Sequence, residues 1–185
     1  MNLKSWTKTI LTVYRHLPKI TKSIDKIFEA RAIGGSVMSS NAMAYNDVYN
    51  LTNNLINLTE RKKSLINLKL LADKVLTSID RDLAKLLILR YIDGYGYDKL
   101  AEHFGVCERT IYRKMNRALD VSVYALLRNG YNENKIENMI EKESWLFEVC
   151  RETAKEDFIT LDTTYLSKVC DNYKKFSLAN YSSSS

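Results

Sequence analysis

The sequence predicts an all-α protein, and two observations support this prediction. The 185 residues include only six glycines and one proline, far fewer than the turns of a β-sandwich, a barrel or a Gly-rich nucleotide-binding fold require. Along most of the chain, apolar residues recur every three or four positions, the spacing of a helix that buries one face. We expect a helical hairpin over residues 1–79, a compact central domain over 80–128, and a tail of C-terminal helices over 129–185, with its last residues disordered.

The first helical element is expected over residues 3–30, where apolar residues follow a heptad spacing. Pro18 lies inside this stripe. Because proline lacks an amide hydrogen and clashes with the preceding turn, it predicts either a kink or a second helix that begins at Pro18. The uncharged segment 32–44 contains Gly34 and Gly35 and predicts a connector. The stripe consists of Leu3, Trp6, Ile10, Val13, Leu17, Ile20, Ile24 and Ile27.

A long helix is expected to begin near Tyr45 and to fold back on the first as an antiparallel hairpin. Lys62 occupies the one seam position of this helix that is not apolar. The two stripes either cover each other within one chain, which we favour, or pair between the chains of a homodimer. The second stripe consists of Val48, Leu51, Leu55, Leu58, Leu65, Leu68, Ala72, Val75 and Ile79.

Residues 80–92 predict a separate buried helix. Asp80 is a good N-cap, and Gly94 supplies a stop shortly after the last apolar residue. Further helices are expected from Asn132 to about residue 155 and from a cap at Asp162 to Phe176. The sequence leaves the role of these C-terminal helices open between covering the core, forming an oligomer and contacting a partner.

The segment after Gly96 predicts two helices joined by a tight turn. The first helix is expected over residues 97–104, the turn over 105–107, and the second helix from Glu108 onward. Gly105 can adopt the positive φ that such a turn needs. The pattern is that of a helix-turn-helix. Its small core is expected to consist of Leu100, Phe104, Val106, Ile111 and Met115, beside the small residue Ala101.

The second helix of this motif has a basic face opposite its apolar face. Arg109, Arg113 and Arg117, together with Asn116, share the side away from Ile111. A guanidinium can bond the O6 and N7 of guanine together and can also bind phosphate, so the stripe suits a major groove. The candidate DNA-binding residues are Glu108, Arg109, Thr110, Tyr112, Arg113, Lys114, Asn116 and Arg117 on the second helix, and Tyr97 and Lys99 on the first.

The excess of positive charge agrees with a polyanionic partner. Of the formal +6, residues 1–59 and 60–120 each contribute +4 and residues 121–185 contribute −2. The excess in residues 1–59 also fits a solvated helix face, whereas that of the helix-turn-helix lies on one side of a single helix.

These residues resemble the DNA-binding fourth region of bacterial sigma factors. The resemblance covers residues 86–119, in the pattern Leu-x-Leu-Arg-Tyr-x-x-Gly, then Tyr-x-x-Leu-Ala-x-x-Phe-Gly-Val, then an Ile-Tyr-Arg helix ending Arg-Ala-Leu. It implies that Glu108, Arg109, Tyr112 and Arg113 read promoter DNA. Residues 1–79 do not resemble the upstream region of a complete sigma factor, and the layout of a long helix before a sigma-like motif resembles phage transcriptional regulators of the RinA and ArpU type.

Two positions depart from the sigma pattern. Gly96 and Cys107 stand where the family usually has serine or threonine as helix N-caps. Glycine is a tolerable cap and cysteine a poor one, so we expect Cys107→Ser to stabilise the protein.

Other chemistry has little support in the sequence. His103 and Cys107 are four residues apart and offer at most half a zinc site, since the remaining histidine and cysteines are distant and unpatterned. We therefore expect no metal, no cofactor and no enzymatic activity. Three unpaired cysteines, together with charges that interrupt every apolar run near the N-terminus, predict a cytoplasmic protein without a membrane span.

The function predicted from the sequence is a sequence-specific transcriptional regulator that binds double-stranded DNA in the major groove. One alternative is a DNA-packaging recognition subunit of the small terminase kind. The other is a sigma-like module that binds RNA polymerase or RNA. The sequence leaves open the DNA target, the sign of regulation and the oligomeric state, including a homodimer through the N-terminal or C-terminal helices.

Overall fold

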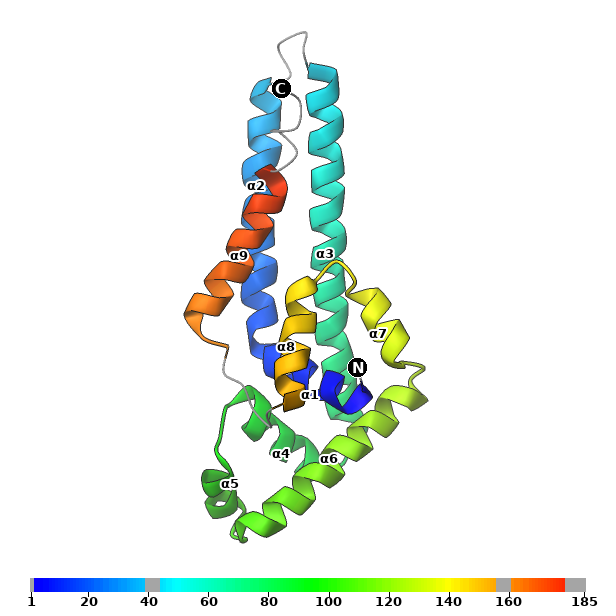
Figure 1. Ribbon diagram of the computed structural model, residues 1–185, viewed down its shortest axis with the longest axis vertical. Coiled ribbons are helices and arrows are strands. Elements are labelled where there is room, and N and C mark those ends of the chain that lie inside the picture. Colours follow the sequence, from blue (N-terminus) through cyan, green and yellow to red (C-terminus); the bar gives the residue numbers. More distant parts are fainter. Residues whose placement is uncertain (1, 39–43, 156–160, 179–185) are drawn as a thin grey trace. The chain divides into compact units, whose positions relative to one another are not determined.

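The computed structural model of the chain describes residues 2–38, 44–155 and 161–178 (Figure 1). The described residues form helices and contain no strand, which confirms the predicted all-α class. The elements up to the central motif are α1 (Leu3–Val13), the 3-10 turn η1 (Tyr14–His16), α2 (Leu17–Met38), α3 (Ala44–Ser78), α4 (Arg81–Leu87) and the π-helical turn η2 (Ile88–Ile92). They are followed by α5 (Tyr97–Phe104), α6 (Glu108–Arg128), α7 (Glu133–Met139), α8 (Ser144–Lys155) and α9 (Thr163–Leu178).

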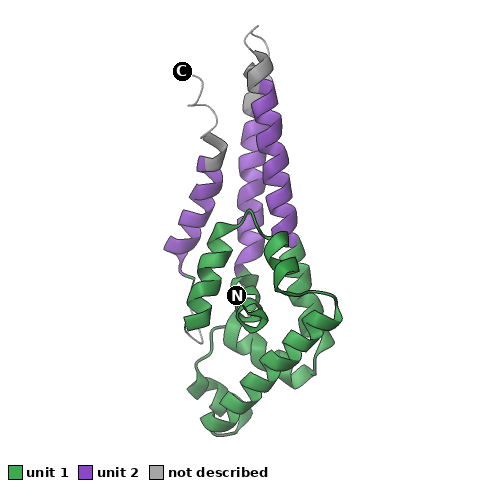
Figure 2. Cartoon of the chain, turned by 45° about the vertical axis from the view of Figure 1, so that its right-hand side comes forward, with its two compact units in different colours: residues 1–15, 67–161 green, residues 16–66, 162–185 purple. Residues whose placement is uncertain are grey.

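The chain forms two compact units, each of which combines segments that are far apart in the sequence (Figure 2). Unit 1 contains residues 1–15 and 67–161, and unit 2 contains residues 16–66 and 162–185. The units therefore follow spatial packing, whereas the boundaries expected after residues 79 and 128 follow chain order. Those boundaries stay a prediction about which parts fold independently.

Pro18 lies at the second position of α2, next to the start at Leu17. The 3-10 turn η1 separates this helix from α1. The structure therefore selects two helices over a single kinked one, because a proline in the first turn removes no helical hydrogen bond. The apolar residues of the predicted N-terminal stripe are all buried, from Leu3 at 5% exposure to Ile27 at 9%.

The predicted connector over residues 32–44 is wrong in its first part. Helix α2 continues through Gly34 and Gly35 to Met38. A glycine inside a helix costs about 1 kcal/mol relative to alanine, and the neighbouring residues contain no proline that would end the helix. Residues 39–43 of the predicted connector lie outside the described residues, and α3 begins at Ala44.

Helix α3 begins within one residue of the predicted start and extends over 35 residues, from Ala44 to Ser78. In unit 2 it runs beside α2 as a hairpin (Figures 1 and 2). The seam residue Lys62 bonds the Asp25 carboxylate of α2, with 2.5 Å between Nζ and Oδ1. The lower part of the predicted stripe is buried, namely Leu58, Leu65, Leu68, Ala72 and Val75.

At two positions of the predicted α3 stripe, the buried residue is the one before the predicted residue. Asn54 and Arg61 are buried, whereas Leu55 is half-buried and Val48 is 48% exposed. The Arg61 guanidinium lies 4.5 Å from the ring centroid of Tyr173 on α9. A residue of a third helix therefore contacts the buried Arg61, which lies one position away from the predicted seam residue Lys62.

Helix α9 begins as predicted. The Asp162 carboxylate accepts a hydrogen bond from the Tyr165 amide at 2.6 Å, which satisfies a free amide at the helix start. Leu166, Val169 and Tyr173 form its buried face. The side chain of Phe176 and the predicted frayed end over residues 179–185 lie outside what the structure describes.

In unit 1, α7 and α8 cover α1. The Trp6 indole donates to a carboxylate oxygen of Glu137 on α7 at 3.1 Å, and its ring meets Phe147 of α8 edge-on at 5.3 Å. The hydroxyls of Thr9 and Thr153 bond at 2.8 Å inside the core. Helix α1 in turn contacts α6 and η2, so these C-terminal helices complete the core that supports the central motif.

Candidate nucleic-acid interface

The base of the central motif is the short helix α4 and the π-helical turn η2. The Asp80 carboxylate accepts a hydrogen bond from the Asp82 amide at 2.9 Å, which confirms the predicted N-cap. The extra residue of a π-turn rotates the following chain relative to an α-helix, and such turns are frequent at functional sites. Gly94, with φ of 78°, ends the element where a stop was predicted.

Helices α5 and α6 have the predicted starts, and the predicted turn joins them. Gly105 adopts φ of 62° and ψ of 36°, a left-handed conformation that strains any residue with a Cβ atom. The Val106 amide bonds the Ala101 carbonyl at 3.0 Å, which closes the end of α5. Residues 105–107 therefore form the tight turn of a helix-turn-helix.

The core of the motif is the one expected. Leu100, Ile111 and Met115 are buried, and Phe104 and Val106 pack against them. The same cluster includes Leu86, Leu87 and Tyr91 from the preceding helical turns, Ala118 and Leu119 of α6, and Leu11 of α1. This core fixes which face of α6 points to solvent.

The basic stripe of α6 lies on that solvent face. Arg109, Arg113, Asn116 and Arg117 are exposed, and no carboxylate of the described residues pairs with the three guanidinium groups. Asp120, one turn beyond, is held by Lys4 of α1 at 2.9 Å. Glu108 is exposed at the helix start. The structure thus brings these side chains to one surface, which carries a net positive charge.

Of the three other candidates, Thr110 and Lys114 have additional contacts within the motif. Thr110 is half-buried, with its hydroxyl 3.3 Å from the Cys107 sulfur. Lys114 is exposed, with its ammonium 5.9 Å from the Phe104 ring centroid. Lys99 is exposed on α5. The two lysines remain available to a polyanion, and Thr110 is partly used by the turn.

Tyr97 and Tyr112 stack on each other rather than standing apart. Their ring centroids are 3.9 Å apart with 24° between the planes. The Arg90 guanidinium of η2 lies 4.2 Å from the Tyr97 centroid. The sequence reasoning did not assign Arg90 to the site, although it is the arginine of the sigma-like pattern Leu-x-Leu-Arg-Tyr-x-x-Gly and the one charged residue in the run 86–92.

Residues 33–120 match the family model of the ECF sigma factor. The chain therefore contains a sigma-factor-like region, and the match supports DNA binding and transcription regulation at that coarse level. The match begins upstream of α3 and includes residues 33–79, so the expectation that no part of residues 1–79 resembles a sigma factor is wrong for this segment. The comparisons with curated proteins and with solved structures found no match.

The two unusual caps of the sigma-like region lack side-chain hydrogen bonds to the helix amides. Gly96 is the N-cap of α5 and has no side chain to cap it, and Cys107 is the N-cap of α6 and makes no side-chain capping hydrogen bond. The hydrogen bond with the Thr110 hydroxyl lowers the pKa of the Cys107 thiol from its ordinary value. Cys107 therefore occupies the cap position without supplying a good acceptor.

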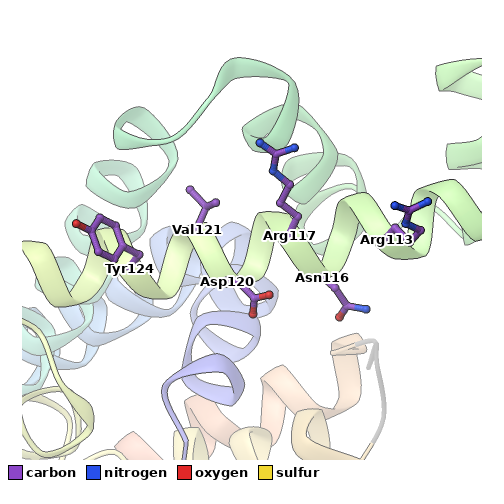
Figure 3. A pocket seen from close by; sticks show the side chains of 6 residues that line it. All are labelled: Arg113, Asn116, Arg117, Asp120, Val121 and Tyr124. Carbon is purple, nitrogen blue, oxygen red and sulfur yellow. The ribbon is translucent and has the colours of Figure 1, made fainter.

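An open groove follows the exposed face of α6 (Figure 3). Its volume, about 580 Å³, is in the range of small-molecule sites, but its described lining residues all come from this one helix. Arg117 and Val121 project to one side, and Asn116 and Asp120 to the other. An open face of this kind suits an extended macromolecule better than an enclosed small ligand.

Within the described part of the chain, no group of three or more histidine, cysteine or acidic side chains is placed to hold a metal ion. Among the described helices, none is long and apolar enough to cross a membrane.

Proposed function

We propose that this protein is a sequence-specific DNA-binding transcriptional regulator that inserts the N-terminal half of α6 into the major groove. The observation that carries the proposal is the exposed, unneutralised stripe of Arg109, Arg113 and Arg117 on the second helix of a helix-turn-helix. A stripe on an ordinary surface helix fits simple solvation. Here the stripe occupies the position that docks in the major groove in proteins with this motif.

The proposed roles follow from side-chain chemistry. Arg109 and Arg113 bond guanine edges, Asn116 bonds an adenine, and Glu108 accepts from cytosine N4. Arg117 and Thr110 bind phosphates from α6. Lys99 and Lys114 neutralise further phosphates, which adds affinity without sequence preference. Tyr112 contributes an apolar ring to the interface, and Tyr97 supports it from α5.

Selection of bound duplexes from a random library tests this proposal. The wild-type chain is expected to enrich a motif, and the double variant Arg109→Glu/Arg113→Glu is expected to enrich none. Arg128→Glu is the matched control, because Arg128 is an exposed arginine at the other end of the same helix. Enrichment that survives the double change contradicts the proposal, as does a wild-type chain that enriches nothing.

The sigma-like match also supports RNA polymerase as a second partner. Duplex binding through several phosphates is expected to weaken steeply with salt, by about one unit of log–log slope per contact. A flat dependence favours the module that binds polymerase or RNA. From the layout of a long helix before the motif, we also propose a regulator of the phage RinA and ArpU type. Native mass measurement separates it from the DNA-packaging subunit: a monomer or dimer supports the regulator, and a ring of many subunits supports packaging.

A further inference from the structure

Three side chains from three different elements form one stack in the sigma-like region. Arg90 comes from the π-turn η2, Tyr97 is the first residue of α5, and Tyr112 lies in the second turn of α6. The Arg90 guanidinium carbon and the Tyr112 centroid lie 4.2 Å and 3.9 Å from the Tyr97 centroid. Two groups at these distances cannot share one face of a ring, so Tyr97 lies between them.

The inner end of the stack is held firmly. Arg90 is only 7% exposed, and one of its terminal nitrogens donates to the Tyr95 carbonyl at 2.8 Å. A buried, planar guanidinium over a tyrosine ring contributes a cation–π attraction that strengthens as water is excluded. Arg90 is too buried to reach a DNA molecule, so any influence on DNA binding must pass through Tyr97.

The outer end of the stack faces the proposed interface. Tyr112 keeps 42% of its surface exposed, although one ring face is taken by Tyr97. It lies between Arg109 and Arg113 in sequence, on the side of α6 that points to solvent. An exposed tyrosine ordinarily samples several rotamers, and the stack restricts Tyr112 before any ligand arrives.

We propose that Arg90 and Tyr97 are positioning residues that hold the Tyr112 ring against the C5-methyl group of a thymine. The inference rests on the proposed function. In the major groove the thymine methyl is the apolar feature among the hydrogen-bonding groups of the base edges. A ring fixed at this place binds a thymine better than another base, because burying the methyl group releases water, whereas burying an unpaired donor or acceptor of another base costs free energy.

Replacement of thymine by deoxyuridine tests the inference, because it removes only the methyl group. Each thymine of the duplex selected by the wild-type chain is replaced in turn, and the dissociation constant is measured. One position is expected to show a loss of about fourfold, the factor for one buried methyl group. In Tyr112→Ser this loss disappears, and Tyr124→Leu, which changes an exposed tyrosine outside the stack, retains it.

Variants of the inner residues separate positioning from simple stability. Tyr97→Phe keeps an aromatic ring and is expected to retain the uracil penalty. Tyr97→Leu removes the stack and is expected to lose it, while the salt dependence of binding stays unchanged. Arg90→Lys keeps the positive charge but loses the planar guanidinium, and it is expected to give a uracil penalty between those of the wild type and Tyr97→Leu. It takes the place of Tyr97→Leu if that variant does not fold.

The outcomes that overturn the inference differ from those that overturn the proposed function. A selected motif that depends on Arg109 and Arg113 but contains no thymine, or shows no uracil penalty, removes the inference alone. So does a penalty of unchanged size in folded Tyr97→Leu or Arg90→Lys. Failure to select any motif removes the proposed function instead.

Discussion

The helix-turn-helix and the α2–α3 hairpin differ in how far their buried faces follow from the sequence. In the helix-turn-helix, Leu100, Ile111 and Met115 are buried as predicted. In α3, the buried face moves from Leu55 to Asn54 and from Lys62 to Arg61. The first motif buries its residues against a helix three residues away in the chain, whereas α3 also packs against α9, about a hundred residues later. At Arg61 the buried face of α3 therefore includes a residue whose partner, Tyr173, no neighbouring position in the sequence indicates.

The largest effect is expected in the motif whose core the sequence predicts. Leu100→Ala removes a fully buried side chain and is expected to destabilise the protein by about 3 kcal/mol, the usual cost of such a cavity. Leu70→Ala is the control, because Leu70 is 58% exposed, and its effect is expected within about 0.5 kcal/mol. Urea denaturation measures both, and equal losses would mean that the core lies elsewhere.

The second expected effect tests the displaced face of α3. Arg61→Ala removes a buried stem and the contact with Tyr173, so we expect a loss of about 1–2 kcal/mol. Lys62→Ala removes only a partly exposed ion pair with Asp25 and is expected to cost about 0.5 kcal/mol. Thermal melting of the two variants ranks them. If Lys62→Ala costs more, the heptad seam describes α3 better than the displaced face.

The turn of the helix-turn-helix should tolerate no side chain. Gly105→Ala places a Cβ atom at φ of 62° and is expected to destabilise the protein by about 1 kcal/mol. The cost arises from backbone strain, since no atom lies within 4 Å of the added carbon. Gly105→Asn, which tolerates this conformation better, is the matched control in the same melting experiment.

A smaller gain is expected at the cap of α6. Cys107→Ser supplies a hydroxyl acceptor for the free amides and should stabilise the protein by about 0.5–1 kcal/mol, seen as a melting temperature raised by a few degrees. The DNA motif selected by the variant should stay the same. An unchanged or lower melting temperature would show that the Cys107–Thr110 contact already serves the cap.

The smallest effect compares two thiols. The hydrogen bond with Thr110 lowers the pKa of Cys107, whereas burial raises the pKa of Cys150. Since the thiolate is the reactive form, Cys107 should be alkylated faster at any pH below its ordinary pKa. Mass spectrometry after brief iodoacetamide treatment measures the two sites. Equal rates in the folded protein would contradict this assignment, and unfolding in urea should remove the difference.

The sequence by itself determined the features that depend on neighbours in the chain. Apolar periodicity predicted the helices, Gly105 and Asp80 predicted a turn and a cap, and the spacing of Arg109 and Arg113 predicted one exposed basic face. The predicted connector was wrong over residues 32–38. The free-energy cost of two glycines is small compared with the helical hydrogen bonds of the surrounding residues, so the helix continues through them.

Only the tertiary structure decided what depends on residues far apart. Three contacts join elements that no local sequence pattern relates. Helices α7 and α8 cover α1, Arg61 of α3 contacts Tyr173 of α9, and Arg90, Tyr97 and Tyr112 form one stack. From the sequence alone, a charged residue such as Arg90 is predicted to be exposed to solvent. Its role appears only when the fold supplies the aromatic face that compensates its burial, since an isolated buried charge is unfavourable.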